Sequence, residues 1–454
     1  MPVTDGPHPP RPTHEVVPPE YDWDGYGFDT RQVHAGEVED PAYGARTAPV
    51  YLSAAFRFDS FEESTRRFGG QDQGQIYSRN LNPTNGVAER RVASLENGAG
   101  AIAVASGQAA ISAALLAIVG HGERFVSTAS IYSGTRILFE RSFGRFGVGV
   151  DYVWDPDDEG EWERAIGPDT KAIFTETIPN PKNDVVDIPA VARIAARHGI
   201  PLIVDNTIGT PALIRPLDHG AHVVVHSGTK FLTGHGAAIS GVIVDGGTFD
   251  WASAGRRYPG ITERPAPGTP SVLELSGRHA YEAFVRAGIV NDLGPALSPV
   301  HAFLLQQGVE TLSLRVERHV DNSLAIARWL AEHPLIESVD YAGLPGHPQH
   351  AVAERLLGGR SGSVFAATVT GGAEAAAVLI DSLRVFSRMT NIGDVRSMVL
   401  HPATTTHLSF APELRERLGI TDGLVRLSVG IETVDDLIAD LDAGLAAVGR
   451  HLGR

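Results

Sequence analysis

The 454-residue chain contains no cysteine. This absence excludes disulfide bonds, thiolate ligands to a metal and a catalytic thiol, and it agrees with a location in the cytoplasm. Basic residues are also scarce, because 38 Lys and Arg stand against 54 Asp and Glu, which gives a formal net charge of −16. A surface of this sign repels phosphate backbones and anionic lipids, so neither nucleic acid nor a membrane is an expected partner.

Strongly hydrophobic long runs are lacking as well. The first residues show no basic start followed by an apolar core, so no signal peptide is predicted. One long uncharged stretch, residues 98–120, is rich in Ala and contains Ser106, Gln108 and Ser112, so it is too weakly apolar for a transmembrane helix. We predict a strand, a turn and a helix there. With 43% hydrophobic and 20% charged residues, the chain has the composition of a globular protein, and its length predicts two or three domains.

Three regions follow one another along the chain. Residues 1–98 form a predicted N-terminal arm and inter-subunit segment, whose Pro-rich start over residues 1–28 is typical of a flexible arm or an extended wrap. Residues 99–300 form a predicted large domain. Residues 301–454 form a predicted connector helix, broken near Gly308, and a smaller C-terminal α+β domain.

Apolar runs and helical patterns alternate in the large domain. The helical pattern of residues 188–199 places Ile188, Val191 and Ile194 on one face, and residues 255–270 have the Pro and Gly content of a loop. Uninterrupted apolar strands between amphipathic helices predict an α/β fold with a mostly parallel sheet covered on both faces. The predicted strands are residues 101–106, 124–129, 172–177, 201–206, 222–227 and 240–246.

Polar residues follow four of these strands. Ligands collect at the carboxyl ends of the strands in an open parallel sheet. The segment after the first strand, Ser106 to Gln108, begins an Ala-rich helix whose free N–H groups suit a phosphate. The other three segments are residues 176–180, Asp205 to Thr207 and Ser227 to Lys230.

Lys230 stands just beyond an apolar strand, after two hydroxyl residues and before a glycine-rich turn. An amine in such surroundings has a lowered pKa and can form a Schiff base. Ser227 and Thr229 can donate to a phosphate, and Asp205 can pair with a protonated ring nitrogen. Phosphate cradle, lysine and carboxylate together are the groups that pyridoxal 5′-phosphate requires of a protein.

Each feature alone has a more ordinary interpretation. Most lysines are solvated surface charges, Asp-Asn-Thr after a strand is usually a turn, and small polar residues commonly begin helices. The GxxxxGK[ST] spacing of a P-loop is absent. His347 and His350 lack a convergent group of acids or histidines, so we predict a loop there and no metal site.

Six motifs follow one another along the chain: "YSRNLNPTN", "ASGQAA", "TIPNPK", "VDNT", "VHSGTKFLTGHG" and "LVRLSVGIE". In this order they resemble the pyridoxal-phosphate-dependent enzymes of Cys/Met metabolism, over about residues 30–450, which favours the cofactor interpretation. The resemblance implies a fold type I transferase with a large and a smaller domain. The segments over residues 308–330 and 391–408, with the insertion after residue 245, are most similar to the O-acetylhomoserine sulfhydrylase branch.

The resemblance assigns a role to each cofactor-binding position. It implies that Lys230 is the catalytic Schiff-base lysine and moves protons between substrate carbons. Asp205 would pair with the ring nitrogen and Asn180 with the ring hydroxyl, while Tyr132 would stack on the ring and help set the protonation state of the amine. The remaining implied cofactor-binding residues are Ser106, Gly107, Gln108, Thr207, Ser227 and Thr229, with Tyr77 and Arg79 reaching the phosphate from the neighbouring subunit of a dimer.

On the substrate side, the resemblance implies that Arg426 binds the α-carboxylate and that Ser397 assists through the loop backbone. The implied reaction is a γ-replacement of methionine biosynthesis, in a homotetramer. Acetate leaves O-acetylhomoserine, and sulfide or a small thiol adds to give homocysteine or methionine. Arg396 stands where cystathionine-forming and cystathionine-cleaving relatives often carry Glu, and no cysteine follows Tyr132, unlike in methionine γ-lyases.

Four positions depart from the usual family pattern, namely Leu52, Ser133, Arg136 and Asn291. They leave open a specialised γ-replacement or γ-elimination enzyme with another nucleophile, such as a carbon or a bulky thiol, or with O-succinylhomoserine. A catalytically silent binding or assembly relative is a further alternative. A scaffold has no need of an intact lysine, aspartate, tyrosine and arginine set, which argues against it.

Overall fold

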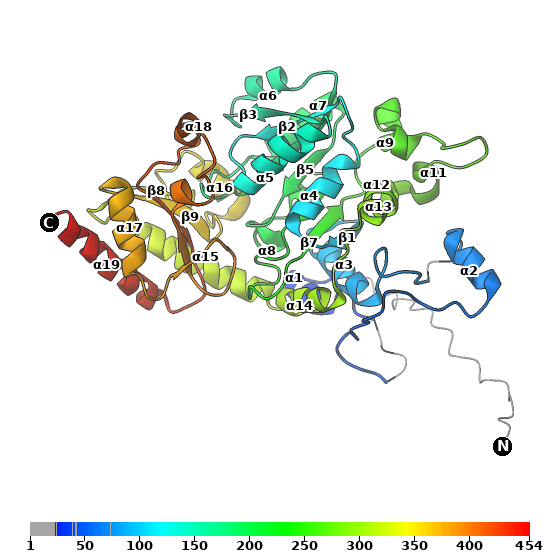
Figure 1. Cartoon of the computed structure of the whole chain (residues 1–454), viewed down its shortest axis with the longest axis horizontal. Coiled ribbons are helices and arrows are strands. Elements are labelled where there is room, and N and C mark those ends of the chain that lie inside the picture. The colour runs from blue at the N-terminus through cyan, green and yellow to red at the C-terminus, as the bar shows by residue number, and fades with distance from the viewer. Residues whose placement is uncertain (1–22, 24, 39, 41–42, 73) are drawn as a thin grey trace.

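The computed structural model describes residues 23, 25–38, 40, 43–72 and 74–454. Residues 1–22 of the predicted N-terminal arm therefore lie outside the described residues. A larger body holds one sheet, and a smaller body at the C-terminal end holds a second (Figure 1).

The first sheet has seven strands in the order β1-β7-β6-β5-β4-β2-β3. β7 is antiparallel to both of its neighbours, whereas β6, β5, β4, β2 and β3 are all parallel. The predicted mostly parallel sheet is confirmed. β3 was not predicted, because four of its five residues are only half-buried and its sequence lacks an apolar run. The strands are β1 (Gly100–Val104), β2 (Arg124–Thr128), β3 (Gly149–Val153), β4 (Thr170–Glu176), β5 (Leu202–Asp205), β6 (Val223–His226) and β7 (Gly241–Asp245).

Helices cover both faces of this sheet. Val224 of β6 packs on the side of α3, while Val223 and Val225 pack on the side of α4. The pattern of residues 188–199 forms α7, which Asp187 caps at its start and Gly199 ends with φ +60°. The helices from α1 to α13 are α1 (Phe28–His34), α2 (Phe61–Phe68), α3 (Pro83–Glu96), α4 (Gly107–Leu116), α5 (Ser133–Ile137), α6 (Glu159–Ala165), α7 (Ile188–His198), α8 (Thr210–Leu213), α9 (Trp251–Ala254), α10 (Pro259–Thr262), α11 (Val272–Ser276), α12 (Ala280–Phe284) and α13 (Asn291–Leu293).

The second sheet follows a helical connector. The predicted break near Gly308 lies between α14 (Pro299–Val309) and α15 (Leu312–Ala331). The sheet has the order β10-β11-β12-β9-β8, and apolar residues of α17 and α19 pack against it. β8, β10 and β11 were not predicted, because they are short or largely exposed. The elements are β8 (Ile336–Asp340), α16 (His350–Leu357), β9 (Val364–Val369), α17 (Gly372–Ser382), β10 (Ser387–Arg388), β11 (Met398–Leu400), α18 (Pro412–Arg417), β12 (Leu424–Ser428) and α19 (Val434–His451).

The uncharged residues 98–120 form β1, a turn and α4, as predicted. Within the described part of the chain, no helix has the length and apolarity to cross a membrane. The predicted loop over residues 255–270 holds only α10 and a short turn.

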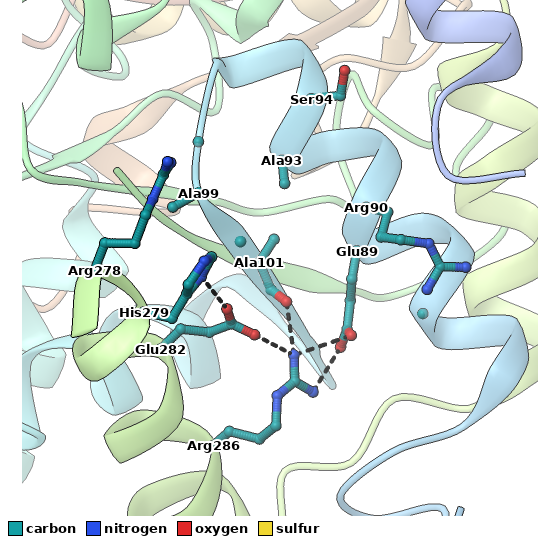
Figure 2. Close-up of a pocket in the computed structure, with 13 residues that line it drawn as sticks. Glu89, Arg90, Ala93, Ser94, Ala99, Ala101, Arg278, His279, Glu282 and Arg286 are labelled. Carbon is teal, nitrogen blue, oxygen red and sulfur yellow. Dashed lines mark hydrogen bonds and ion pairs between the residues drawn. The ribbon is translucent and has the colours of Figure 1, made fainter. Parts of the chain in front are cut away.

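A polar pocket of about 520 Å³ lies between α3, β1 and the segment around α12. Arg286 crosses it and donates to Glu89, to Glu282 and to the carbonyl oxygen of Ala101 (Figure 2). None of the predicted cofactor-binding residues lines this pocket. Because its central charges are paired with one another, the pocket ties α3 to β1 and is not the candidate active site.

Candidate active site

The carboxyl ends of β4, β5 and β6 lie side by side. Glu176 is in register with Asp205, and Asp205 with Val225. The backbone N–H of Ser227 donates to Thr207 Oγ1 at 2.8 Å, which joins the turns that follow β5 and β6. The structure therefore brings together the polar segments that the sequence placed after these strands.

The start of α4 meets the turn after β6. Ser106 caps α4, and its Oγ accepts from the backbone N–H of Ala109 at 3.1 Å. A Cβ on Gly107 would lie 2.6 Å from the Cβ of Ser227, so only glycine allows this approach. The free N–H groups of α4 and the Ser227 hydroxyl thus stand close enough to share one phosphate. The Thr229 hydroxyl exchanges hydrogen bonds with the backbone of Ser240, at 3.0 and 3.2 Å.

The side chains of Tyr132 and Gln108 both lie next to Gly134. A Cβ on Gly134 would lie 2.5 Å from Tyr132 Cε1 and 3.1 Å from Gln108 Nε2. Gln108 Oε1 is buried without a hydrogen-bond partner among the described residues. Tyr132 keeps 41% of its surface exposed, so its ring can stack on a planar ligand. Burial raises the pKa of Tyr132, while the charge of Arg426 opposes this increase.

Two neighbouring carboxyl groups have different environments. Asp205 Oδ1 accepts from the backbone N–H of Thr207 at 2.9 Å, and Glu176 Oε1 accepts from that of Tyr132 at 2.8 Å. Burial and the negative charge of Asp205 raise the pKa of Glu176 well above its ordinary value. Burial also raises the pKa of Asp205, but hydrogen bonds from Thr207 oppose it. We infer that Glu176 holds the proton and Asp205 the negative charge, which suits a protonated ring nitrogen.

Lys230 faces a residue of the C-terminal domain. Its Nζ donates to Asn391 Oδ1 at 2.5 Å. Burial and the charge of Arg426 lower the pKa of Lys230 to about 8. A useful fraction of this amine is therefore uncharged near neutral pH. Asn391 was not predicted as a site residue, and its place in the "NIGDVRS" motif was the only signal available.

Arg426 lies on β12 and is only 2% exposed. Its Nη2 donates to the carbonyl oxygens of Asn391 at 3.0 Å and Met389 at 3.4 Å, while its Nε has no partner in the described part of the chain. Burial lowers the pKa of Arg426 to about 10, so it stays charged. An immobilised guanidinium with an unused donor near Lys230 and Tyr132 can bind a carboxylate.

Ser397 lies on the loop that ends at β11. Its backbone N–H and its Oγ donate to the carboxylate of Glu432 at 2.6 and 2.9 Å, and its Oγ accepts from the N–H of Gly430 at 2.8 Å. The neighbouring Arg396 pairs with Asp394 at 2.9 Å and donates to the carbonyl oxygen of His235 at 3.0 Å. Ser397 is therefore fixed within its loop, while Arg396 joins this loop to the one that carries Lys230.

Asn180, Tyr77 and Arg79 are the remaining predicted positions. Asn180 is 8% exposed and follows β4 at the same edge of the sheet. Arg79 Nη1 donates to the carbonyl oxygen of Asn291 at 2.7 Å, and its guanidinium lies 5.6 Å from the centre of the Tyr77 ring. Within the described residues of one chain, these contacts do not bring Tyr77 and Arg79 to the strand ends.

Arg136, one of the four positions that depart from the family pattern, is buried and hydrogen-bonded. It is 3% exposed, and it donates to Glu140 at 2.8 Å and to the carbonyl oxygen of Ala129 at 3.0 Å. Its guanidinium lies 3.9 Å from the centre of the Tyr152 ring, so the two side chains make a cation–π contact. Among the other departures, Leu52 is 74% exposed, Ser133 is buried, and the Asn291 carbonyl binds Arg79.

These residues fit pyridoxal phosphate. The close contact of Gly107 with Ser227 and the unpartnered Gln108 Oε1 mark the place of the phosphate and the ring edge. The carboxylate of Asp205 suits the ring nitrogen, and the lysine of lowered pKa suits the aldehyde. No group of three or more His, Asp or Glu in the described residues could hold a metal ion.

Comparisons with known proteins agree with this site. Residues 29–446 match the family described as "Cys/Met metabolism PLP-dependent enzyme". The chain is 46% identical to an O-acetyl-L-homoserine sulfhydrylase of Corynebacterium glutamicum, over 95% of this chain and 100% of the relative. It is 41% identical to a homocysteine synthase of Schizosaccharomyces pombe, over 92% and 98% of the two chains.

A solved structure shares the fold. A candidate O-acetylhomoserine (thiol)-lyase of Campylobacter jejuni, which carries a pyridoxyl-lysine, superposes with a TM-score of 0.89 at 33% identity, covering 93% of this chain and 100% of the other. The fold is therefore that of the type I pyridoxal-phosphate-dependent enzymes, as the sequence predicted. The chain belongs to the Cys/Met-metabolism family of pyridoxal-phosphate-dependent enzymes.

Proposed function

We propose that this enzyme catalyses γ-replacement on O-acetylhomoserine, with sulfide or a small thiol as the nucleophile. The products are homocysteine or methionine, and acetate. The observation that carries the proposal is the 46% identity to an O-acetyl-L-homoserine sulfhydrylase, over the full length of that relative. The exposed Arg396 beside the loop of Lys230 agrees with it, because a glutamate there would suit a substrate with a second amino group.

Bound pyridoxal phosphate supplies a ring that accepts electrons from the α-carbon of an attached amino acid. Asp205 would keep the ring nitrogen protonated, Asn180 would bind the ring hydroxyl, and Tyr132 would cover one face of the ring. The phosphate would lie between the start of α4 and the turn after β6. The donors there would be Ser106, Gly107, Gln108, Thr207 and Ser227, and Thr229 would join them if its hydroxyl turns away from the Ser240 carbonyl oxygen.

Arg426 and Lys230 would act on the amino acid itself. Arg426 binds the α-carboxylate with its buried guanidinium, while Ser397 holds the neighbouring loop in place. Lys230, with its pKa near 8, would take the α-proton, pass it to the bound cofactor, and then take a β-proton, which allows acetate to leave the γ-carbon. After the sulfur nucleophile has added to the γ-carbon, Lys230 returns the protons. Asn391 holds the lysine amine through both transfers.

We further propose a cytoplasmic homotetramer in which each active site is shared by two subunits. Tyr77 is 44% exposed, and with Arg79 it is presented at a surface of the single chain. The pair would complete the phosphate site of the neighbouring subunit. Mixing a Lys230→Ala protein with an Arg79→Ala protein tests this, because subunit exchange would restore sites with both residues intact. Activity that stays absent after exchange would contradict shared sites.

A substrate panel tests the reaction. O-acetylhomoserine and O-succinylhomoserine are each supplied with sulfide, methanethiol or cysteine, and the amino acid products are measured. Sulfide with O-acetylhomoserine should give the highest kcat/KM. Comparable turnover with cysteine, yielding cystathionine, would refute the proposal, and turnover without any nucleophile would indicate a lyase. Lys230→Ala is the control, and it should neither turn over nor retain a borohydride-trapped cofactor.

A specialised γ-replacement is the second candidate, because Arg136, one of the departures from the family pattern, lies in the turn that begins at Tyr132, and its backbone N–H donates to the Tyr132 carbonyl oxygen at 3.1 Å. Larger thiols and carbon nucleophiles added to the same panel would detect it. An Arg136→Tyr protein is the matched comparison. If that substitution shifts preference toward sulfide, Arg136 contributes to nucleophile selection.

A further inference from the structure

A buried pair of ionisable side chains in contact lies behind the strand ends, on the face of the sheet that α3 covers. His226 Nε2 and Glu96 Oε1 are 2.7 Å apart, and neither side chain is exposed. Asn206 Nδ2 donates to the same Glu96 oxygen at 2.9 Å. The proposed mechanism uses none of these three side chains, although burying charged groups is costly.

Two members of this cluster, Asn206 and His226, are each next to a predicted cofactor-binding residue. Asn206 follows Asp205, and His226 precedes Ser227. Since successive side chains of extended backbone point to opposite faces, one residue of each pair can meet the cofactor while the other meets α3. The cluster also reaches the end of β4, because Thr177 Oγ1 donates to Asn206 Oδ1 at 2.9 Å. One carboxylate on α3 thus anchors the carboxyl ends of three parallel strands.

The contacts of the cluster are enclosed. Glu96 Oε1 contacts both His226 Nε2 and Asn206 Nδ2. Glu96 Oε2 and His226 Nδ1 have no hydrogen-bond partner among the described residues. Because the loss of either contact to Glu96 Oε1 would leave a further buried polar group unpaired, the cluster favours one arrangement of the turns after β5 and β6.

We propose that Glu96, His226 and Asn206 form a positioning cluster that holds Asp205 and Ser227 at the spacing of the cofactor ring and phosphate. This inference rests on the cofactor roles proposed for Asp205 and Ser227. The contacts of Glu96 Oε1, at 2.7 Å to His226 and 2.9 Å to Asn206, fix the backbone directly beside both of these residues.

The test uses Glu96→Gln and His226→Asn holoenzymes, with Asp205→Asn as the reference and Glu89→Gln as the matched control. Glu89 is another buried carboxylate of α3, but it binds Arg286 and the backbone of Ala103 in β1 instead of the ends of β4, β5 and β6. Three quantities are measured: the dissociation constant of pyridoxal phosphate, the visible absorption spectrum of the bound cofactor, and the melting temperature of the protein.

We expect Glu96→Gln and His226→Asn to weaken cofactor binding about tenfold or more. They should also change the visible spectrum in the same direction as Asp205→Asn, whereas Glu89→Gln should lower only the melting temperature. Variants that melt earlier but keep the wild-type spectrum and affinity would overturn the inference. If Glu96→Gln does not fold, Asn206→Ser removes one donor and must show the same spectral change in weaker form; a wild-type spectrum and affinity would overturn the inference. An unchanged Asp205→Asn spectrum and affinity would instead refute the cofactor role of Asp205 and the inference that rests on it.

Discussion

Replacing Asn391 with Ala should lower the pKa of Lys230. The substitution removes the amide oxygen that accepts from Lys230 Nζ at 2.5 Å and keeps the carbonyl oxygen that accepts from Arg426. A hydrogen bond to a charged group contributes about 1.5–3 kcal/mol, and 1.4 kcal/mol corresponds to about one pKa unit. Water can replace part of the lost bond, so we take the lower end of this range. The pKa of Lys230 should then fall from about 8 to about 7.

The assay is the rate at which pyridoxal phosphate attaches to the cofactor-free protein as a function of pH. Only the neutral amine reacts, so the rate profile has its inflection at the pKa of Lys230. We expect the inflection near 8 in the wild type, near 7 in Asn391→Ala and above 8 in Asn391→Asp, because a carboxylate stabilises the ammonium. KM for the amino acid should change little, since the backbone contact to Arg426 remains. Coincident profiles in three folded proteins would refute the reasoning.

Three further substitutions test other parts of the structure. Arg426→Lys should raise KM for the amino acid about tenfold to a hundredfold with less effect on kcat, because an ammonium cannot form the planar fork; equal losses in kcat and kcat/KM would contradict this. Gly107→Ala should weaken pyridoxal phosphate binding more than tenfold by pushing Ser227 away, as measured by dialysis, whereas Gly144→Ala, in open space on a helix, should leave it unchanged. Burial lowers the pKa of His319 to about 4, below its unfolded value near 6.5, so the contribution of its neutral ring to stability is complete above pH 6.5 and is lost toward pH 4. The free energy of unfolding, measured with urea, should therefore fall between pH 6.5 and pH 4 by about 3 kcal/mol less in His319→Asn than in the wild type. Parallel plots of this free energy against pH for the two proteins would exclude the role of His319.

The sequence predicts the sheet of the large domain well, because its central strands are buried on both faces. β6 is an unbroken apolar run, and such a run has few alternatives once helical patterns flank it. The missed strands have another character. β8 is half-buried to exposed along its whole length, and both residues of β10 are exposed. These strands therefore form because they pair with neighbouring strands, and their own sequences carry no hydrophobic signal.

The candidate site divides in a similar way. Motifs located the side chains that lie at the strand ends, since Asp205, Ser227 and Lys230 stand directly after apolar runs. His226 belongs to one of these motifs, but its contact with Glu96 joins residues 130 positions apart and becomes visible only through the fold. A buried histidine within a strand has the ordinary interpretation of a core residue until its partner is known.

Asn391 shows why the chemistry of Lys230 depends on the C-terminal domain. The lysine stands on the large domain, whereas its hydrogen-bond acceptor is 161 residues away in a loop between β10 and β11. The amide of Asn391 binds the amine, and its carbonyl oxygen binds the guanidinium of Arg426. Any displacement of this loop therefore changes the surroundings of the amine of Lys230, for which we propose proton transfer, and of the guanidinium of Arg426, for which we propose carboxylate binding. Because Arg426 also lowers the pKa of Lys230, a substrate carboxylate that neutralises the guanidinium should raise the basicity of the lysine at the step that needs a base.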